Sequence, residues 1–279
     1  MDKLVTSING KIVRRGQDKI SVFDNSLLYA DGLFEACLAV DDYIVSLSDH
    51  LSRLYRGARV MGMKLPVSRR TMTAWVRETV KTHPDRVKKI RITVTAGESA
   101  RWTGRHGPPQ VIISAAPNVF PSQPYRLHLS EFRVDQDSIF RRIKTISYAI
   151  HAAALRQARA KKCDDALLIN EKGQVAEASS ANLYWAKKNR IYTPPLSSGC
   201  LDGITRRIVI RDGHRYAAKV VEKNGTLTDL IAADEVFITS SLKLVVPVIS
   251  IKAGQHKYSF QPGPLTEELH GHFVRQAHL

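Results

Sequence analysis

One lysine and one glutamate near the middle of the chain have surroundings that could support chemistry. Lys144 lies between Ile143 and Ile146 and precedes an alanine-rich run at 149–160. A lysine with apolar neighbours at a strand-to-helix junction loses part of its hydration, which disfavours the ammonium form and makes the amine a nucleophile. Glu177 lies in the run VAEASSAN, whose small side chains cannot pair with a carboxylate. It therefore needs a cationic or hydrogen-bonding partner from outside this run, and a protonated pyridine nitrogen would serve.

Taken alone, neither residue indicates a function, because the chain has 42 Lys plus Arg and most lysines and glutamates are solvated. A series of motifs indicates more. They are IKT followed by Tyr148, DDALL at 164–168, GQVAEASSANLYW at 173–185, YTPPL at 192–196 and GCLDGITR at 199–206. In this order they resemble the fold-type IV (class IV) aminotransferases, which use pyridoxal 5'-phosphate (PLP). The resemblance covers nearly the whole chain.

The resemblance implies an α+β fold with two domains. We expect a small N-terminal α/β domain at 1–117, a linker at 118–124, and a larger PLP-binding domain with a barrel-like β core at 125–279. The linker range contains Pro121 and Pro124, which suit an extended connection. The family's sites lie at a domain cleft closed by a partner subunit, so the resemblance also implies a homodimer.

Local patterns predict several elements of these domains. Asn9-Gly10 between apolar runs is a strong hairpin signal. Ser48-Asp49 suits a helix N-cap, because the residues after it place Leu51, Leu54 and Ala58 on one helical face. Further expected elements are strands at 33–40, 111–117 and 125–134, helices at 68–81, 204–212, 226–232 and 265–276, and hairpin turns at 171–173 and 187–189.

The resemblance assigns the covalent chemistry to Lys144, which would hold PLP as a Schiff base. The freed amine would then move the substrate α-proton to and from the cofactor. Glu177 would keep the ring nitrogen protonated, so that the ring can accept electrons. Tyr148 would donate a hydrogen bond to the phenolate oxygen of the ring, although a half-buried helix residue is an equal alternative for it.

The phosphate of PLP needs cations and hydrogen-bond donors. Arg53, in the pattern H-x-x-R-L, is the family's phosphate arginine, and a guanidinium suits that task because it binds phosphate oxygens in a bidentate manner. Ile204 and Thr205 begin a predicted helix after a glycine turn, where free N–H groups bind anions. Leu201 would contact a face of the ring. Ser241 occupies the position of a small hydroxyl residue that reaches the phosphate in the family.

Two residues are candidates for substrate binding. Phe34, in the segment DGLFE, stands where the family has an aromatic that faces the active site, and a core aromatic is the alternative. Arg101 falls at the offset of the family's arginine for the substrate carboxylate, with Arg105 as a second candidate. Both arginines lie in a loop rich in glycine, arginine and proline, and such loops commonly carry substrate contacts.

Composition restricts the other classes of function. The net charge is +16, but the basic residues are spread along the chain without interleaved aromatics, which does not favour nucleic-acid binding. The sequence has no run of about 18 apolar residues, so a membrane span is not expected. The N-terminal residues lack an apolar signal core, and the three cysteines have no metal-like spacing. A cytoplasmic protein without a metal site is therefore expected.

Two enzymatic functions share this pattern. The first is a transaminase of the branched-chain or D-amino-acid type, which moves an amino group between an amino acid or amine and a 2-oxo acid. The second is an aminodeoxychorismate lyase, which forms 4-aminobenzoate and pyruvate. Ala36 and Ser240 stand where well-known lyases have threonine and asparagine, which favours the transaminase. Leu244 replaces a glutamate of the branched-chain enzymes, so the L-branched-chain assignment stays open. A non-catalytic basic binding protein is the remaining alternative.

Overall fold

The computed structural model describes residues 4–99, 107–213 and 219–279. The chain divides into two compact units. Unit 1 comprises Met1–Val119 with Ile143–Ser147, and unit 2 comprises Phe120–Arg142 with Tyr148–Leu279. The sequence places residues 143–147 in the second domain, but this division assigns them to the first unit.

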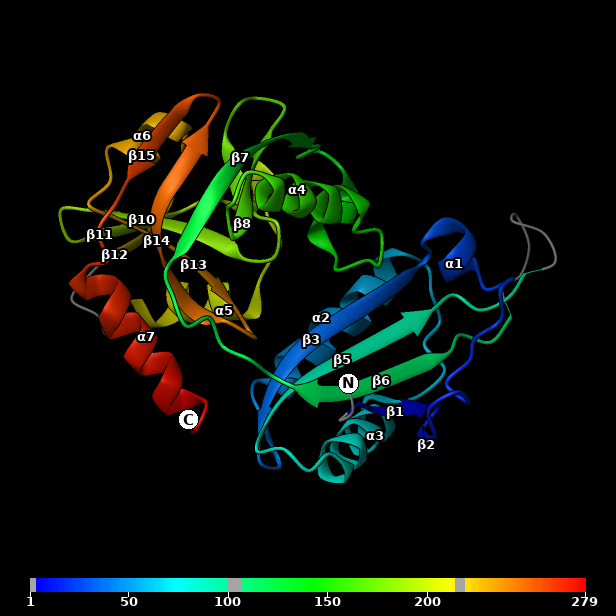
Figure 1. Cartoon of the computed structure of the whole chain (residues 1–279). Helices are drawn as coiled ribbons and strands as arrows, with labels where there is room; N and C mark the ends of the chain where they lie inside the picture. Colours follow the sequence, from blue (N-terminus) through cyan, green and yellow to red (C-terminus); the bar gives the residue numbers. More distant parts are fainter. Residues whose placement is uncertain (1–3, 100–106, 214–218) are drawn as a thin grey trace. The chain divides into compact units, whose positions relative to one another are not determined.

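Unit 1 is an antiparallel sheet covered by two helices (Figure 1). The strand order is β2-β1-β6-β5-β3-β4, with β1 Val5–Ile8, β2 Lys11–Val13, β3 Gly32–Val40, β4 Tyr43–Ile44, β5 Val87–Thr95 and β6 Val111–Pro117. The short helix α1 (Asn25–Tyr29) precedes β3, and α2 (Leu47–Val60) and α3 (Arg69–Thr82) pack on the sheet through one shared apolar core. The predicted hairpin at Asn9-Gly10 is confirmed, because Ile8 pairs with Lys11.

The start of helix α2 differs from the sequence prediction. The N-cap residue is Ser46, two residues before the predicted Ser48, and its side chain makes no capping hydrogen bond. The apolar face was predicted correctly, because Leu51, Leu54 and Ala58 are buried. Helix position is thus set by burial of this face rather than by the side-chain cap. In α3, by contrast, the hydroxyl of Ser68 caps the helix by accepting from Thr71 N.

Unit 2 contains a strongly curled sheet of nine strands (Figure 1). The order is β12-β11-β10-β13-β14-β7-β8-β9, and β15 pairs with β14 outside this path. The strands are β7 Tyr125–Val134, β8 Asp165–Asn170, β9 Val175–Ala178, β10 Asn182–Lys187, β11 Arg190–Thr193, β12 Lys219–Glu222, β13 Glu235–Ser240, β14 Leu244–Ala253 and β15 His256–Ser259. Ala178 N donates to the Ala181 carbonyl, so a tight turn connects β9 to β10.

The described residues of unit 2 also form four helices and two short 3-10 turns. They are η1 Ile139–Arg142, α4 Ala149–Ala160, η2 Leu196–Ser198, α5 Ile204–Asp212, α6 Leu227–Ile231 and α7 Pro264–Gln276. Helix α4 packs on β7 and β8 through small side chains, of which Ala154 and Ala158 are fully buried. The predicted helices at 204–212 and 265–276 and the predicted hairpin turns at 171–173 and 187–189 are confirmed.

The C-terminal helix α7 is attached through a buried carboxylate. Glu235, on β13, accepts hydrogen bonds from Leu265 N at 3.2 Å, Thr266 N at 2.9 Å and Thr266 Oγ1 at 2.6 Å. These are donors of the first helical turn, which have no partner inside a helix. A negative charge at this end of a helix is also favoured by the helix dipole. Glu235 therefore takes the role that an N-cap residue of α7 would otherwise have.

Within the described ranges, no helix has both the length and the apolar character needed to cross a membrane.

Candidate active site

The main chain around Lys144 is fixed against the first residues of β3 in unit 1. Phe34 N donates to the Lys144 carbonyl at 2.9 Å, and Ile146 N donates to the Gly32 carbonyl at 3.0 Å. The segment 143–147 therefore runs alongside β3 and is bonded to it at Lys144 and at Ile146. The Lys144 amine thus projects from a main chain whose position is set by the sheet rather than by a free loop.

The Lys144 amine lies over an aromatic ring. Lys144 Nζ is 4.3 Å from the centroid of the Phe34 ring, and the guanidinium carbon of Arg91 is 4.0 Å from the same centroid. Phe34 is buried, so it is both a core aromatic and a neighbour of the candidate catalytic amine. Arg91, on β5, is a residue that the sequence did not single out. The Phe34 ring attracts both cations through its π face.

Arg53 belongs to a buried ionic cluster with Glu35 and His50. Glu35 lies on β3 and is fully buried, and the other two residues come from α2. Arg53 Nε donates to Glu35 Oε1 at 2.8 Å, Arg53 Nη2 donates to Oε2 at 2.7 Å, and His50 Nδ1 lies 2.7 Å from Oε2. Two nitrogens of the predicted phosphate arginine therefore bind a carboxylate of the protein. The sequence analysis missed this pairing, although H-x-x-R places both residues on one edge of the helix.

The cluster keeps Glu35 ionised. Burial alone would raise the pKa of Glu35, but the Arg53 charge and the hydrogen bonds from Arg53 and His50 lower it from 4.5 to about 2. The pKa of His50 is lowered, mainly because the ring is buried, and the charges of Arg53 and Lys144 lower it further, although Glu35 opposes this. The imidazole is therefore favoured in its neutral form beside a charged Arg53–Glu35 pair.

We expect Glu35→Gln to destabilise the protein and to flatten its acid sensitivity. The substitution leaves a buried guanidinium without its carboxylate, which costs about 3–5 kcal/mol of unfolding free energy at neutral pH. Since the folded-state pKa of Glu35 is lowered, its contribution is present above pH 4.5 and is lost as the pH falls towards 2. Urea unfolding of both proteins along this range, with the exposed Glu78→Gln as control, measures the difference. Equal pH slopes for wild type and Glu35→Gln would contradict the pKa assignment.

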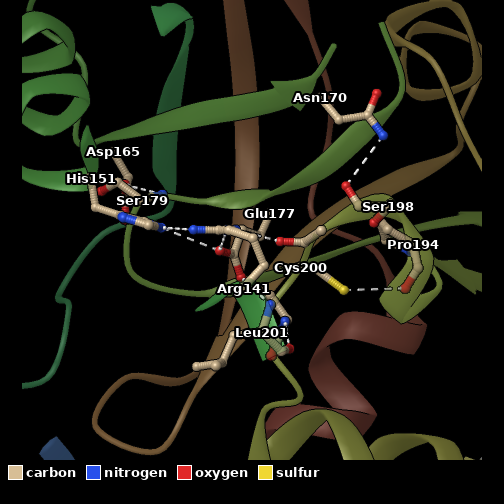
Figure 2. A network of polar contacts seen from close by, with 12 residues as sticks. Arg141, His151, Asp165, Asn170, Glu177, Ser179, Pro194, Ser198, Cys200 and Leu201 are labelled. Carbon is tan, nitrogen blue, oxygen red and sulfur yellow. Dashed lines mark hydrogen bonds and ion pairs between the residues drawn. The ribbon is translucent and has the colours of Figure 1, made fainter. Parts of the chain in front are cut away.

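Glu177 lies at the centre of a polar network in unit 2 (Figure 2). Its Oε1 accepts from Arg141 Nη2 and lies 3.3 Å from His151 Nε2, and its Oε2 accepts from Leu201 N at 2.9 Å. Arg141 also donates from Nε to the Gly199 carbonyl at 2.8 Å. The sequence correctly predicts that the small neighbours of Glu177 cannot pair with it. The cationic partner is Arg141, a protein side chain that sequence reasoning missed.

The network also determines the charge of Glu177. Burial would raise the pKa of Glu177, but the Arg141 charge, the His151 contact and the Leu201 N–H lower it to about 2. Arg141 Nη1 lies 3.0 Å from His151 Nε2 and can only donate. Nε2 is also 3.3 Å from Glu177 Oε1, so it accepts from Arg141 in one tautomer and donates to Glu177 in the other. The His151 ring stacks on Tyr148 with centroids 4.1 Å apart, which places the predicted ring-oxygen donor beside the network.

The start of α5 is held close to Glu177 by the loop 199–203. Asn182 Nδ2 donates to the Leu201 carbonyl at 2.8 Å, and a Cβ on Gly203 would lie 2.0 Å from Asn182 Oδ1. Glycine is therefore required at position 203. Ile204 and Thr205, both buried, form the first turn of α5, so their N–H groups have no acceptor inside the helix.

Ser241 lies in the turn between β13 and β14. The hydroxyl of Ser240 accepts from Lys243 N at 3.2 Å, so this neighbouring serine closes the turn. Leu244, which begins β14, has φ 58 and is therefore in the left-handed region. A residue with a Cβ rarely adopts this conformation without support from its surroundings.

The predicted site residues thus form two groups, one in each unit. Unit 1 brings Phe34 and Lys144 together and contains Arg53. In unit 2 the Glu177 network joins Leu201 directly and Tyr148 through His151, while Ile204, Thr205 and Ser241 lie in the same unit. Arg101 and its alternative Arg105 lie outside the described residues. Residues missed by sequence reasoning are Glu35, Arg91, Arg141 and His151. The last could have been suspected, because it is the one histidine in an alanine-rich helix.

Comparison with known proteins identifies the family. The family model described as amino-transferase class IV matches residues 32–251. A D-alanine aminotransferase of Bacillus licheniformis is 31% identical over 264 residues, which cover 94% of this chain and 93% of the relative. An aminodeoxychorismate lyase of Bacillus subtilis (strain 168) is 27% identical over 269 residues, which cover 94% of this chain and 91% of the relative.

A solved structure of the same kind shows the fold. A branched-chain amino acid aminotransferase from T.th., complexed with N-(5'-phosphopyridoxyl)-L-glutamate, has a TM-score of 0.88 at 28% identity, and covers 97% of this chain and 92% of its own. This chain belongs to the class IV aminotransferase family, whose members use PLP, and it is an enzyme with the fold-type IV architecture. The predicted α+β fold and the predicted family are confirmed.

Proposed function

We propose that this enzyme is a transaminase that moves an amino group between an amino acid or amine and a 2-oxo acid, with PLP bound at Lys144. The observation that carries the proposal is the state of Glu177, a buried carboxylate that Arg141, His151 and Leu201 N keep ionised. A carboxylate with a pKa near 2 binds a protonated ring nitrogen and does not take its proton. That is the property required of the acid partner of a pyridine cofactor.

The residues present fit PLP on further grounds. Glu177 Oε2 accepts one hydrogen bond from Leu201 N, and a carboxylate oxygen can accept a second. When bound, PLP stabilises negative charge that develops at the substrate α-carbon. The Lys144 amine then holds and returns the α-proton.

The phosphate of PLP would be bound by backbone N–H groups, hydroxyls and a guanidinium. In this proposal the N–H groups of Ile204 and Thr205, the hydroxyls of Thr205 and Ser241, and the Arg53 guanidinium share its negative charge. The Arg53–Glu35 pair supports this role, because a guanidinium anchored through Nε and Nη2 has lost most of its side-chain freedom. Leu201 would lie against the cofactor ring, and Tyr148 would donate to its phenolate oxygen.

Arg91 is a candidate for binding the carboxylate of the substrate. Its guanidinium and the Lys144 amine lie on the same Phe34 ring, at 4.0 Å and 4.3 Å from the centroid. A substrate that reacts at the amine has its carboxylate within a few ångströms of the reacting carbon. Arg91 is thus placed for this contact within unit 1, while Arg101 keeps the same assignment as a prediction from the sequence.

The proposal is tested with a panel of amino donors. Purified protein with PLP is given L-amino acids, D-amino acids or a simple chiral amine as donor, with 2-oxoglutarate or pyruvate as acceptor, and the new amino acid is quantified. In a separate reaction, 4-amino-4-deoxychorismate is supplied without any 2-oxo acid. Amino transfer from at least one donor is the expected result. Release of pyruvate and 4-aminobenzoate at enzymatic rates, with no transfer, would establish the lyase alternative instead.

We also propose that the enzyme is a homodimer in the cytoplasm. An apolar patch around α1 supports the dimer, because Val22, Phe23, Leu27, Leu28 and Tyr29 are all between 49% and 65% exposed. Monomeric proteins rarely expose so many large apolar side chains within one short segment. Three buried free thiols, Cys37, Cys163 and Cys200, suit a reducing compartment.

We expect Leu28→Arg to weaken self-association. The substitution places a charge in the patch, whose burial between two copies would then leave that charge desolvated. Light scattering after size-exclusion chromatography measures the mass of both proteins over a dilution series. Val60→Arg, at an apolar residue that is 44% exposed on α2, is the matched control. A wild-type protein that is monomeric at high concentration would refute the dimer.

A further inference from the structure

Asp165 is a fully buried carboxylate that joins three separate segments of unit 2. It lies at the start of β8 and accepts from Ala166 N at 2.8 Å, Ser179 N at 3.1 Å and Ser180 Oγ at 2.8 Å. The Ser179 hydroxyl donates to it as well. Without donors such as these, the burial of a carboxylate would be costly. The residues Asp165, Ser179, Ser180 and Lys243 are called the Asp165 cluster below.

Lys243 supplies the cation of the Asp165 cluster from a distant part of the sequence. Lys243 Nζ lies 3.2 Å from Asp165 Oδ2 and donates to Ser180 Oγ at 2.6 Å. The ammonium also lies 5.2 Å from the centroid of the Tyr125 ring. Its side chain is 22% exposed, so the ion pair is largely withdrawn from solvent. Partly buried pairs are screened less than surface pairs, and breaking one leaves an uncompensated charge.

The cluster connects the two loops of unit 2 that the proposed function uses. Ser179 follows Glu177 by two residues, and both its N–H and its hydroxyl bind Asp165. Lys243 follows Ser241 by two residues and binds the same carboxylate. The proposed partner of the ring nitrogen and a proposed phosphate ligand are therefore each two residues from a ligand of Asp165. One buried charge fixes the main chain at both places.

The β13–β14 turn needs such support. Ser240 pairs with Leu244 across the turn, and Leu244 has φ 58. The left-handed conformation costs a residue with a Cβ about 1 kcal/mol, so the sequence does not favour this turn by itself. Lys243, directly before Leu244, is the turn residue that makes a charged tertiary contact. Its pairing with Asp165 opposes the tendency of the turn to relax.

We propose that Lys243 is a positioning residue for cofactor binding. Through Asp165 it fixes the distance between the turn that carries Ser241 and the segment that carries Glu177. This inference rests on the proposed function, because a fixed distance matters only if both residues bind one PLP molecule. It adds a residue to that function which touches neither the cofactor nor the substrate. A purely structural ion pair would change the stability of the whole unit and leave the affinity of the folded protein for PLP unaltered.

The test uses Lys243→Met, Lys243→Arg, Asp165→Asn and the double variant Asp165→Asn/Lys243→Met. Lys257→Met, at an exposed lysine on β15 of the same sheet, is the control. The first measurement is PLP titration of cofactor-free protein, followed by visible absorbance at a temperature where every variant is folded. We expect Lys243→Met to weaken PLP binding by about tenfold. The double variant should bind PLP at least as tightly as whichever of Lys243→Met and Asp165→Asn binds it less tightly, because both substitutions remove the same ion pair. Lys243→Arg, which keeps the charge, should bind within about threefold of wild type.

The second measurement is amide hydrogen exchange on the cofactor-free proteins. Lys243→Met should raise exchange in peptides that cover 178–181 and 240–244, with no change in β10 or β11. The proposal would be overturned if Lys243→Met had wild-type PLP affinity and unchanged amide exchange in these two peptides. It would also be overturned if amide exchange rose throughout unit 2 while PLP affinity stayed at the wild-type value. If wild type binds no PLP, the proposed function fails. The link between the two loops is then decided by the exchange result alone.

Discussion

Lys144→Ala is expected to remove both covalent attachment of PLP and amino transfer. The substitution takes away the only group in the proposal that can bond to the cofactor, and it also takes away the base that moves the α-proton. Loss of general-base catalysis alone can lower turnover by about 10⁴-fold. Because the covalent bond to the cofactor is lost as well, we expect a decrease of at least this size. Intact mass after borohydride reduction measures attachment, and the donor panel measures transfer.

The position of Lys144 makes the variant informative. Its main chain is held by the bonds between Phe34 N and the Lys144 carbonyl and between Ile146 N and the Gly32 carbonyl, which alanine retains. The fold should therefore persist, and the loss would be chemical. Lys172→Ala, at an exposed lysine in the β8–β9 turn, controls for the loss of one positive charge. A Lys144→Ala protein that still gains the mass of reduced PLP at one site would show that another amine is the anchor.

Glu177→Gln is expected to retain PLP but to lower turnover by about 10²–10³-fold, the usual cost of removing one preorganised electrostatic partner. Glutamine keeps the size of the side chain, but its one carbonyl oxygen can accept from Arg141 or from Leu201 N and not from both, because these donors bind different oxygens of the carboxylate. It lacks the negative charge that holds a proton on the ring nitrogen. Since the pKa of Glu177 is about 2, its ionisation contributes no acidic limb to the wild-type activity above about pH 4.

Two controls separate charge from packing at this site. Glu171→Gln removes a carboxylate from an exposed turn and should leave the rate unchanged. Arg141→Met removes the main cation beside Glu177, so it should raise the pKa of that carboxyl and introduce an acidic limb into the pH profile of turnover. A Glu177→Gln enzyme with wild-type turnover would exclude Glu177 from the reaction, whatever its contacts.

The elements that the sequence predicts well are those with local signals. The hairpin at Asn9-Gly10 follows from two residues that tolerate positive φ, and both have it, at 50° and 81°. The buried face of α2 follows from its helical periodicity. The N-cap of α2 was missed because Ser46 makes no capping side-chain bond, which leaves the serine at 48 as the more typical signal. Local patterns therefore give element type and face better than element ends.

In the candidate site, the sequence indicated the central residues but not their partners. The resemblance singled out Lys144, Glu177 and Arg53, but it gave none of the side chains that set their charge. Glu177 and Arg141 are 36 residues apart, Glu35 and Arg53 are 18 apart, and Asp165 and Lys243 are 78 apart. No periodicity along the chain relates such residues, because pairing across a sheet or between a strand and a helix is fixed only by the completed fold. These partners could therefore be found only in the structure.

The bond between Glu235 and the start of α7 has a practical meaning for anyone who shortens or tags this chain. If the chain ended before residue 264, the buried Glu235 carboxylate would lose its hydrogen bonds from Leu265 N, Thr266 N and Thr266 Oγ1. Water would then have to enter the protein to replace these three donors. An added peptide after Leu279 leaves those three donors in place. Truncated versions should therefore accumulate in the insoluble fraction, while versions extended at the same end should express like the parent.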